Sequence, residues 1–276
     1  MTWTTTADPD AFLAAAGAFL QANPAANSVV LTRVETMLGR PSADALLGWW
    51  QPGGADVGGA FMHTPPYPVV LTAMPAAAAA ALADTLERPL PGVNGDARAT
   101  AAFASAWTDR TSATARVHRR MRLHRLDALI PPRPLPPGEP VLAGADQRDL
   151  VVAWYEAFGA EIDEPAGDVR PSVDDRLAYG GLTLWMLDGA PVSCAGVTRR
   201  VAGMARVAPV YTPPEHRGRG YGAAATAAVS RAAIEAGVRE LLLYTDLANP
   251  TSNRLYARLG YKPVEDSVVL LFDDST

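Results

Sequence analysis

The chain has 276 residues, enough for one large domain or two of ordinary size. Apolar residues make up 49% and charged residues 19% of it, a composition typical of a globular protein with a substantial core. The net charge of −5 gives no electrostatic signature of a nucleic-acid partner, and no apolar run approaches the roughly 20 residues that cross a bilayer. The start, MTWTTTADPD, lacks the features of a signal peptide, so we expect a cytoplasmic protein with no membrane partner.

The only cysteine, Cys194, lies in the segment PVSCAG. A lone cysteine cannot form an internal disulfide and argues against a cysteine-based zinc site. A cysteine among small and apolar residues is typical of a buried side chain rather than a nucleophile. We therefore expect neither a bound metal nor thiol chemistry.

The first half of the chain carries few local signals. The segment MPAAAAAALADTLE predicts a helix that begins after Pro75, because alanine is the best helix former and proline suits a first turn. The basic segment TARVHRRMRLHRLDAL reads as a helix with a solvated arginine face. The segment IPPRPLPPGEP that follows can continue neither a helix nor a central strand. We predict a linker at 131–140 between domains at 1–130 and 141–276.

The second half gives clearer patterns. Residues 146–162 place apolar side chains at helical spacing, and residues 182–199 read as two strands around the turn Asp188-Gly189. A strand at 204–212 precedes a glycine-rich turn and a helix at 221–237 that ends at Gly237. A short buried strand at 240–246, a helix at 252–260 and a last strand at 266–272 complete the order. This order predicts an α/β fold with a mixed sheet.

One segment recurs in the two halves. GGAFMHTPPYP at 58–68 resembles ARVAPVYTPPEH at 205–216, and in both an apolar run and a ring side chain precede Thr-Pro-Pro. Together with the proline-rich linker between the two copies, this echo suggests two domains of related fold. The first copy has no arginine-glycine turn, so the first domain should not bind the same ligand in the same way.

The turn TPPEHRGRGYG at 212–222 joins a strand to a helix, an arrangement that suits a phosphate group. A P-loop needs a Gly-Lys-Ser/Thr sequence, which is missing here. The dinucleotide fingerprint is formally matched by Gly218, Gly220 and Ala223, but too little chain follows the turn for the rest of such a sheet. A third pattern, Arg/Gln-x-x-Gly-x-Gly/Ala, is met by Arg217, Gly220 and Gly222.

With this third pattern and the downstream segment YTDLANPTSNRLYARLGYKPV, the sequence resembles the GCN5-related N-acetyltransferase (GNAT) family. The resemblance covers about 141–276 and is specific from about 205 to 263. It implies the GNAT acyl-CoA N-acyltransferase fold in two tandem domains, of which the first is degenerate. It also implies acetyl-CoA as co-substrate, bound where two central parallel strands, at 204–212 and 240–246, separate.

The resemblance assigns roles to individual residues. Tyr256 is implied as the general acid that protonates the leaving thiolate, and Glu215 is a candidate base, although a water chain could serve instead. A backbone N–H near Val210 or Tyr211 would polarise the thioester carbonyl. The residues implied in acetyl-CoA binding are Val210, Tyr211, Thr212, Arg217, Gly218, Arg219, Gly220, Tyr221, Gly222, Ala223, Asn249 and Ser252.

The expected function is transfer of an acetyl group from acetyl-CoA to a primary amine of a small molecule or peptide, by a monomer or homodimer. Candidate walls of the acceptor pocket are residues 174–181 and the region of Trp185, with Asp174 and Asp175 read as an acidic start of a helix. Two alternatives stay open: a module that binds acetyl-CoA without turnover, as a sensor, and a dinucleotide oxidoreductase.

Overall fold

The computed structural model describes residues 2–39 and 44–273, and it contains two compact units. Unit 1 comprises the described residues up to Leu123, with 246–248 and those from Glu265 onward. Unit 2 comprises His124–Thr245 and Asn249–Val264. The compact units therefore do not follow the expected bounds of 1–130 and 141–276, and the boundaries of folding domains stay a prediction.

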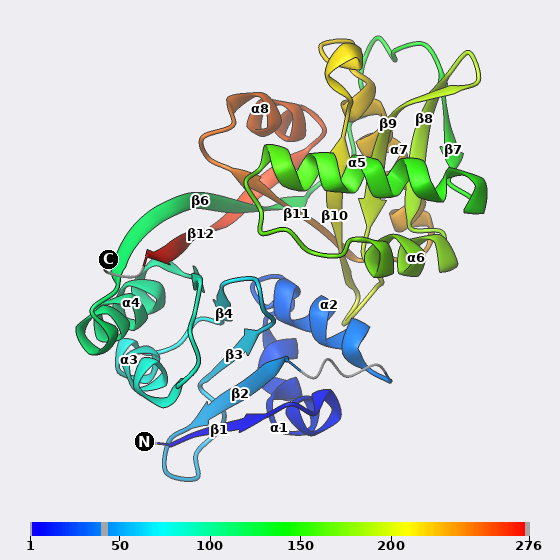
Figure 1. The fold of residues 1–276 in the computed structure, drawn as a ribbon. Helices are drawn as coiled ribbons and strands as arrows, with labels where there is room; N and C mark the ends of the chain where they lie inside the picture. The colour runs from blue at the N-terminus through cyan, green and yellow to red at the C-terminus, as the bar shows by residue number, and fades with distance from the viewer. Residues whose placement is uncertain (1, 40–43, 274–276) are drawn as a thin grey trace. The chain divides into compact units, whose positions relative to one another are not determined.

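The helices and strands repeat one order twice along the chain (Figure 1). The first set is β1 (Thr2–Thr6), α1 (Pro9–Ala22), α2 (Ser28–Met37), β2 (Leu46–Gln51), β3 (Gly59–His63), β4 (Val69–Leu71), α3 (Ala76–Thr85), β5 (Gly92–Gly95), α4 (Ala97–Thr111) and β6 (Thr114–Leu126). The second set is β7 (Glu139–Leu142), α5 (Arg148–Glu161), α6 (Arg170–Ala178), β8 (Leu182–Leu187), β9 (Ala190–Val197), β10 (Met204–Tyr211), α7 (Tyr221–Glu235), β11 (Glu240–Asp246), α8 (Pro250–Arg258) and β12 (Tyr261–Asp273). Among the described residues, two short 3₁₀ helices, at Ala145–Gln147 and Pro214–His216, interrupt the second set and none interrupts the first. This repetition agrees with the expected tandem organisation of a mixed α/β fold.

The last strand of each set is shared between the units. In unit 1 the end of β12 pairs with β5, so that Val268 lies opposite Gly95 and Leu271 opposite Gly92. In unit 2 the end of β6 is the neighbour of β11, and His124 contacts Thr245 there. Each unit thus contains the end of the final strand of the other set.

The basic segment at 114–129 contains the whole of β6, and the expectation of a helix there was wrong. The reason lies in partners that are distant in sequence. Arg116 pairs with Asp273 and Arg122 with Asp266, both on β12, while Arg125 pairs with Glu240 on β11. A local pattern of arginines cannot show that acidic strands will lie beside it.

The Thr-Pro-Pro echo joins positions that are not equivalent in the structure. Residues 64–66 follow β3, whereas residues 212–214 follow β10, which by element order corresponds to β4. The turn that corresponds to the glycine-rich one is the segment 72–75 between β4 and α3, and it contains no glycine. The repeated order of elements, and not this short match, therefore supports two related domains.

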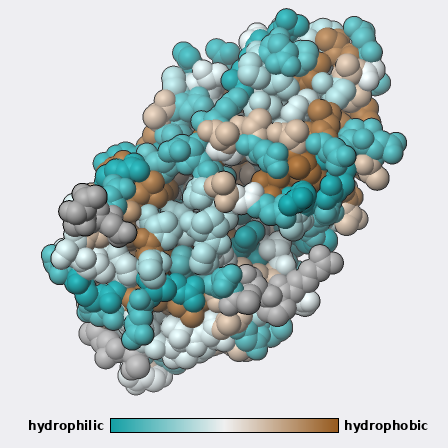
Figure 2. Space-filling view, in the orientation of Figure 1, coloured by the Kyte–Doolittle hydropathy of each residue, from teal (hydrophilic) through white to brown (hydrophobic). Residues whose placement is uncertain are grey.

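The sheet of unit 2 carries helices on both faces. On one face α7 covers a cluster that includes Ala205, Val207 and Leu243. On the other face α5 and α6 cover a cluster that includes Leu184 and Cys194. Figure 2 shows hydrophobic atoms at the surface of unit 2 as well, around α5 and β7, where Leu142 is 62% exposed.

Several local signals were read correctly. The helix α3 begins after Pro75, the hairpin of β8 and β9 turns at Asp188-Gly189 with both residues at positive φ, and α7 ends just before Gly237 with a φ of +83°. Cys194 is fully buried, and burial raises the pKa of its thiol to about 12. A thiol with so high a pKa stays protonated and inert.

Candidate functional site

The central parallel strands β10 and β11 separate partway along their length. Their register runs only from Met204 opposite Glu240 to Arg206 opposite Leu242, and β10 then continues to Tyr211 and β11 to Asp246 (Figure 1). The backbone of two parallel strands that diverge keeps polar groups that face the gap. An extended ligand can pair with these groups as an added strand does.

The antiparallel partner on the other side of β10 is β9, and it sets which backbone groups face the gap. Val210 lies opposite Ala195 and Tyr211 opposite Cys194. Neighbouring residues of a strand direct their N–H and C=O groups to opposite sides. One of Val210 and Tyr211 therefore directs its peptide groups away from β9, towards β11.

The turn between β10 and α7 leaves an open main-chain surface at the start of a helix. Gly220 is the N-cap residue of α7 with a φ of +85°, and Gly218 has a φ of +75°, conformations that favour glycine. A Cβ on Gly218 would meet no atom within 4 Å, and one on Gly220 would meet only Pro136, at 3.8 Å. The first amides of a helix lack intrahelical partners, and α7 has no acidic side chain in its first turn. This surface suits an anion.

The two arginines of the turn differ in their contacts. The Nε of Arg217 donates to the carbonyl of Thr212 at 2.8 Å, and its Nη2 donates to Oε1 of Glu161 at the end of α5. Arg217 therefore braces the turn from within. Arg219 is exposed and has no ion pair or side-chain hydrogen bond within the described residues. Of the two predicted side chains, Arg219 offers a guanidinium with no competing carboxylate.

The end of β10 is braced by Ser193 on β9. The hydroxyl of Ser193 donates to the carbonyl of Tyr211 at 2.9 Å and lies 2.9 Å from the hydroxyl of Thr212. The ring of Tyr211 is buried, and its hydroxyl donates to Glu161 at 3.5 Å. Burial, with the charge of Glu161, raises the pKa of Tyr211, so this phenol stays neutral. The strand end that leads into the turn is thus held rigidly.

The remaining predicted residues of the turn lie in the first turn of α7. The side chain of Tyr221 is buried, with its ring edge-on to that of His216. A Cβ on Gly222 would lie 3.1 Å from the hydroxyl oxygen of Thr212, so α7 approaches the end of β10 closely here. Together with Ala223, these residues supply the amides at the start of α7.

The helix α8 begins with a side-chain cap. Asn249 is its N-cap residue, and its Oδ1 accepts a hydrogen bond of 3.0 Å from the amide of Ser252. Capping satisfies an amide that the helix itself leaves without a partner. Both residues that the sequence assigned to the ligand are therefore used in starting the helix, and the ligand role remains a prediction.

Tyr256 lies on α8, packed against the cluster under α7 and edge-on to Tyr261, with ring centroids 6.1 Å apart. Burial raises the pKa of Tyr256 to about 12. Its hydroxyl makes no hydrogen bond with another described residue. The phenol consequently keeps its proton at neutral pH, the form that a proton donor needs.

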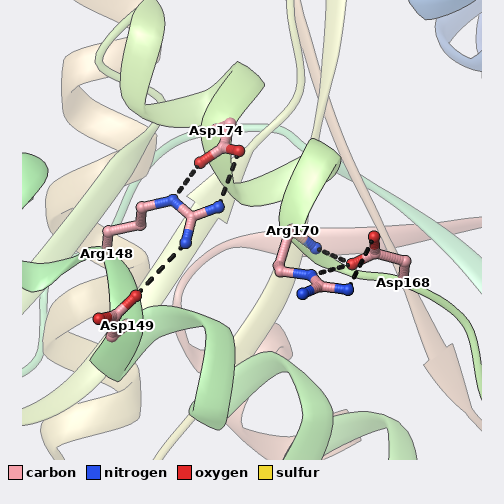
Figure 3. Close-up of polar contacts among 5 residues, drawn as sticks. All are labelled: Arg148, Asp149, Asp168, Arg170 and Asp174. Atoms are coloured by element: carbon pink, nitrogen blue, oxygen red, sulfur yellow. Dashed lines mark hydrogen bonds and ion pairs between the residues drawn. The ribbon is translucent and has the colours of Figure 1, made fainter.

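The acidic candidates are placed less favourably. Glu215 is exposed on the one-turn helix Pro214–His216. Asp174 lies inside α6, where it receives two hydrogen bonds, of 2.6 and 2.9 Å, from Arg148 on α5 (Figure 3). Asp175 pairs with Arg199 at 2.7 Å. The reading of Asp174 and Asp175 as the start of a helix was wrong, because these acids bind neighbouring arginines in mid-helix.

Other ion pairs fix the same helices. Arg148 also contacts Asp149, and Asp168 accepts hydrogen bonds from Arg170 at the start of α6 (Figure 3). The bond with Arg148 holds the pKa of Asp174 below its usual range. Trp185, a suggested wall of the acceptor pocket, is only 2% exposed, and its Nε1 donates to the carbonyl of Pro137. Trp185 is thus a core residue.

Two polar side chains beside β10 were not singled out from the sequence, although one of them lies within the suggested pocket wall at 174–181. Arg176 on α6 donates from Nη2 to the carbonyl of Ala208 at 3.2 Å, and Tyr155 on α5 lies against it. Neither belongs to a recognisable motif, and only the packing of α5 and α6 on the sheet brings them to β10.

No group of three or more His, Cys, Asp or Glu side chains in residues 2–39 and 44–273 could hold a metal ion. None of the helices formed by these residues is sufficiently long and apolar to span a membrane.

A divergent parallel strand pair beside a glycine turn at a helix start has the geometry that suits a ligand with an extended arm and a phosphate group. Residues 148–261 match the model of the acetyltransferase (GNAT) family, and this part of the chain is a GNAT domain. Proteins of that family transfer acetyl groups from acetyl-CoA. No curated protein matches the chain by sequence.

Solved structures share the fold over nearly the whole chain. A GCN5-related N-acetyltransferase from Sphaerobacter thermophilus has a TM-score of 0.64 and 20% identity, over 99% of this chain and 95% of its own. A GNAT acetyltransferase from Colwellia psychrerythraea has a TM-score of 0.60 and 13% identity, over 100% of both chains. A tandem GNAT protein from the clavulanic acid biosynthesis pathway has a TM-score of 0.56 and 17% identity, over 99% and 98%. The expected GNAT fold in tandem is confirmed.

Proposed function

We propose that this protein is an acetyl-CoA-dependent N-acetyltransferase that acetylates a primary amine of a small molecule or peptide. The observation that carries the proposal is the open glycine turn at the start of α7, next to the gap where β10 leaves β11. The turn and the gap meet the two needs of a nucleotide thioester, an anion site and an extended backbone surface. The first set of elements, which lacks such a turn, is the degenerate partner domain.

Each part of the proposed site has a separate role in binding or activating acetyl-CoA. The amides at the start of α7, with Gly218 and Gly220, hold the diphosphate, and Arg219 adds a cation. The peptide groups of Val210 or Tyr211 that face the gap pair with the pantetheine arm and polarise the thioester carbonyl. Arg217 keeps the turn in place through Thr212 and Glu161.

The reaction is a direct displacement. The neutral amine attacks the thioester carbonyl carbon, a C–N bond forms, and the C–S bond breaks as coenzyme A leaves. The proton lost by the amine passes to water or to Glu215. Tyr256 protonates the departing thiolate, and its raised pKa keeps that proton available until the thiolate forms.

The test combines calorimetry with a thiol-release assay over a panel of amines. We expect acetyl-CoA to bind and free coenzyme A to appear only when an acceptor is present. If acetyl-CoA binds but no acceptor releases coenzyme A, the protein is a sensor module and not an enzyme. Binding of NAD and not of acetyl-CoA would overturn the assignment of the turn.

A further inference from the structure

The strand β10 contains a bulge where it passes β9. Val207 lies opposite Val197 and Val210 opposite Ala195, so that Ala208 and Pro209 together face the single residue Gly196. A bulge leaves backbone groups of the extra residue outside the ladder of hydrogen bonds. Pro209 has no N–H to leave unpaired, and the carbonyl of Ala208 is one of the backbone groups at the bulge that needs a partner.

Arg176 supplies that partner. Its Nη2 donates to the carbonyl of Ala208 at 3.2 Å, and its Nη1 donates to the carbonyl of Ser172, one turn earlier on α6, at 3.1 Å and also to the Ser172 hydroxyl. The guanidinium is thus fixed at one edge to α6 and reaches across to the bulge. The planar guanidinium carries donors at fixed separate positions, which suits it to bond both oxygens at once.

Gly196 shows how tightly the bulge is packed. A Cβ built on it would lie 2.6 Å from the hydroxyl of Tyr155, 2.9 Å from the carbonyl of Ala208 and 3.3 Å from Nε of Arg176. Groups from α5, α6 and β10 therefore converge on the space where a side chain would be. Only glycine allows the Ala208 carbonyl and the guanidinium to come this close to β9.

The charge of Arg176 is not neutralised locally. Its hydrogen-bond acceptors are oxygens of Ser172 and Ala208, all of them neutral, and it forms no ion pair with any residue that the structure describes. The buried Nε has no hydrogen-bond acceptor, and neither does the hydroxyl of Tyr155, which is 6% exposed. A cation in such surroundings exerts a stronger field than one in water. This positive charge lies directly beside the bulge.

We propose that Arg176 is a positioning residue for acetyl transfer, which fixes the bulge through the Ala208 carbonyl and so orients the Val210 and Tyr211 peptide groups that polarise the thioester. Its positive charge also favours the oxyanion that develops on the thioester carbonyl in the transition state. This inference rests on the proposed function.

The test compares Arg176→Gln, which keeps a donor but removes the charge and the fork, with Arg200→Gln as a matched control. Arg200 also donates to main-chain carbonyls, those of Ala236 and Gly237, but at the far end of α7. In Arg176→Gln we expect kcat to fall by about 10- to 100-fold, because small misplacements of catalytic groups cost this much. The Kd for acetyl-CoA should stay within about threefold, since the diphosphate turn is intact. The control should keep the wild-type kcat.

A spectroscopic readout separates positioning from general damage. Infrared difference spectra with acetyl-CoA labelled with ¹³C at the carbonyl should show the bound thioester band at lower frequency than in water. In Arg176→Gln the difference in band frequency between bound and free acetyl-CoA should be smaller. An unchanged band with wild-type kcat would overturn the inference, and so would a loss of acetyl-CoA affinity at unchanged kcat.

A second variant covers the case in which Arg176→Gln does not fold. Ser172→Ala releases one side of the guanidinium without removing its charge, and we expect a decrease of kcat of a few-fold, with the band displaced less. Wild-type behaviour of Ser172→Ala, in kcat and in the band, would then overturn the inference.

If the wild-type protein itself neither binds acetyl-CoA nor releases thiol, the proposed function fails, and the role of Arg176 fails with it. Activity in the wild type with no effect of either variant would refute the role of Arg176 alone.

Discussion

Replacing Gly220 by aspartate places a carboxylate at the start of α7, where the proposal puts the diphosphate. Two costs follow, and they can be separated. The backbone φ of +85° strains any residue that has a Cβ, by about 1–2 kcal/mol. Space is not limiting, because the nearest atoms to a new Cβ belong to Pro136 at 3.8 and 3.9 Å.

The charge contributes the larger effect on binding. A carboxylate about 5 Å from a phosphate charge is repelled by about 3 kcal/mol at an effective dielectric constant of about 20. This energy corresponds to a Kd for acetyl-CoA that is higher by on the order of 100-fold. The effect should weaken at high ionic strength, because the turn is exposed and salt screens the repulsion.

The assay is calorimetric titration with acetyl-CoA at low and high salt, with thermal unfolding measured in parallel. Gly220→Ala is the first control, since it carries the same strain without the charge. Gly189→Asp is the second, since Gly189 has a φ of +79°, no atom within 4 Å of a new Cβ, and a place in the hairpin of β8 and β9. Equal affinity of Gly220→Asp and Gly220→Ala would refute the reasoning, because the anion would then bind elsewhere.

The other predictions concern three further residues. Tyr256→Phe should lower kcat by at least tenfold and leave the Kd for acetyl-CoA unchanged; equal turnover in the thiol-release assay would remove Tyr256 from the mechanism. Asn249→Ala should cost about 1 kcal/mol in urea unfolding through the lost cap of α8, and a stability equal to wild type would show that the cap is unimportant. Burial, with the charge of Arg88, lowers the pKa of His63 to about 4 from 6.5 in the unfolded chain. The folded protein therefore binds fewer protons in that window, so about 3 kcal/mol of stability present above pH 6.5 should be lost as the pH falls to 4. His63→Phe should abolish that slope in urea unfolding at different pH values; an unaltered slope would assign it to other groups.

The sequence by itself determined the elements whose causes are local. Closely spaced glycines after a strand end predicted the turn at 212–222. Gly237 and Gly260 marked helix ends because their positive φ suits glycine. These features depend on residues only a few positions apart, so their causes are contained in short segments of the sequence.

The tertiary structure alone decided what depends on distant partners. The segment at 114–129 became a strand because acids near residues 240 and 266–273 lie beside its arginines. Asp174 became a partner of Arg148, and Arg217 a partner of Glu161, because α5 packs against both α6 and the turn. The contacts of Gly196 and Arg176 with the Ala208 carbonyl exist only because β10 has a bulge at this point. Such contacts join residues from separate elements, and no local pattern encodes which elements will meet.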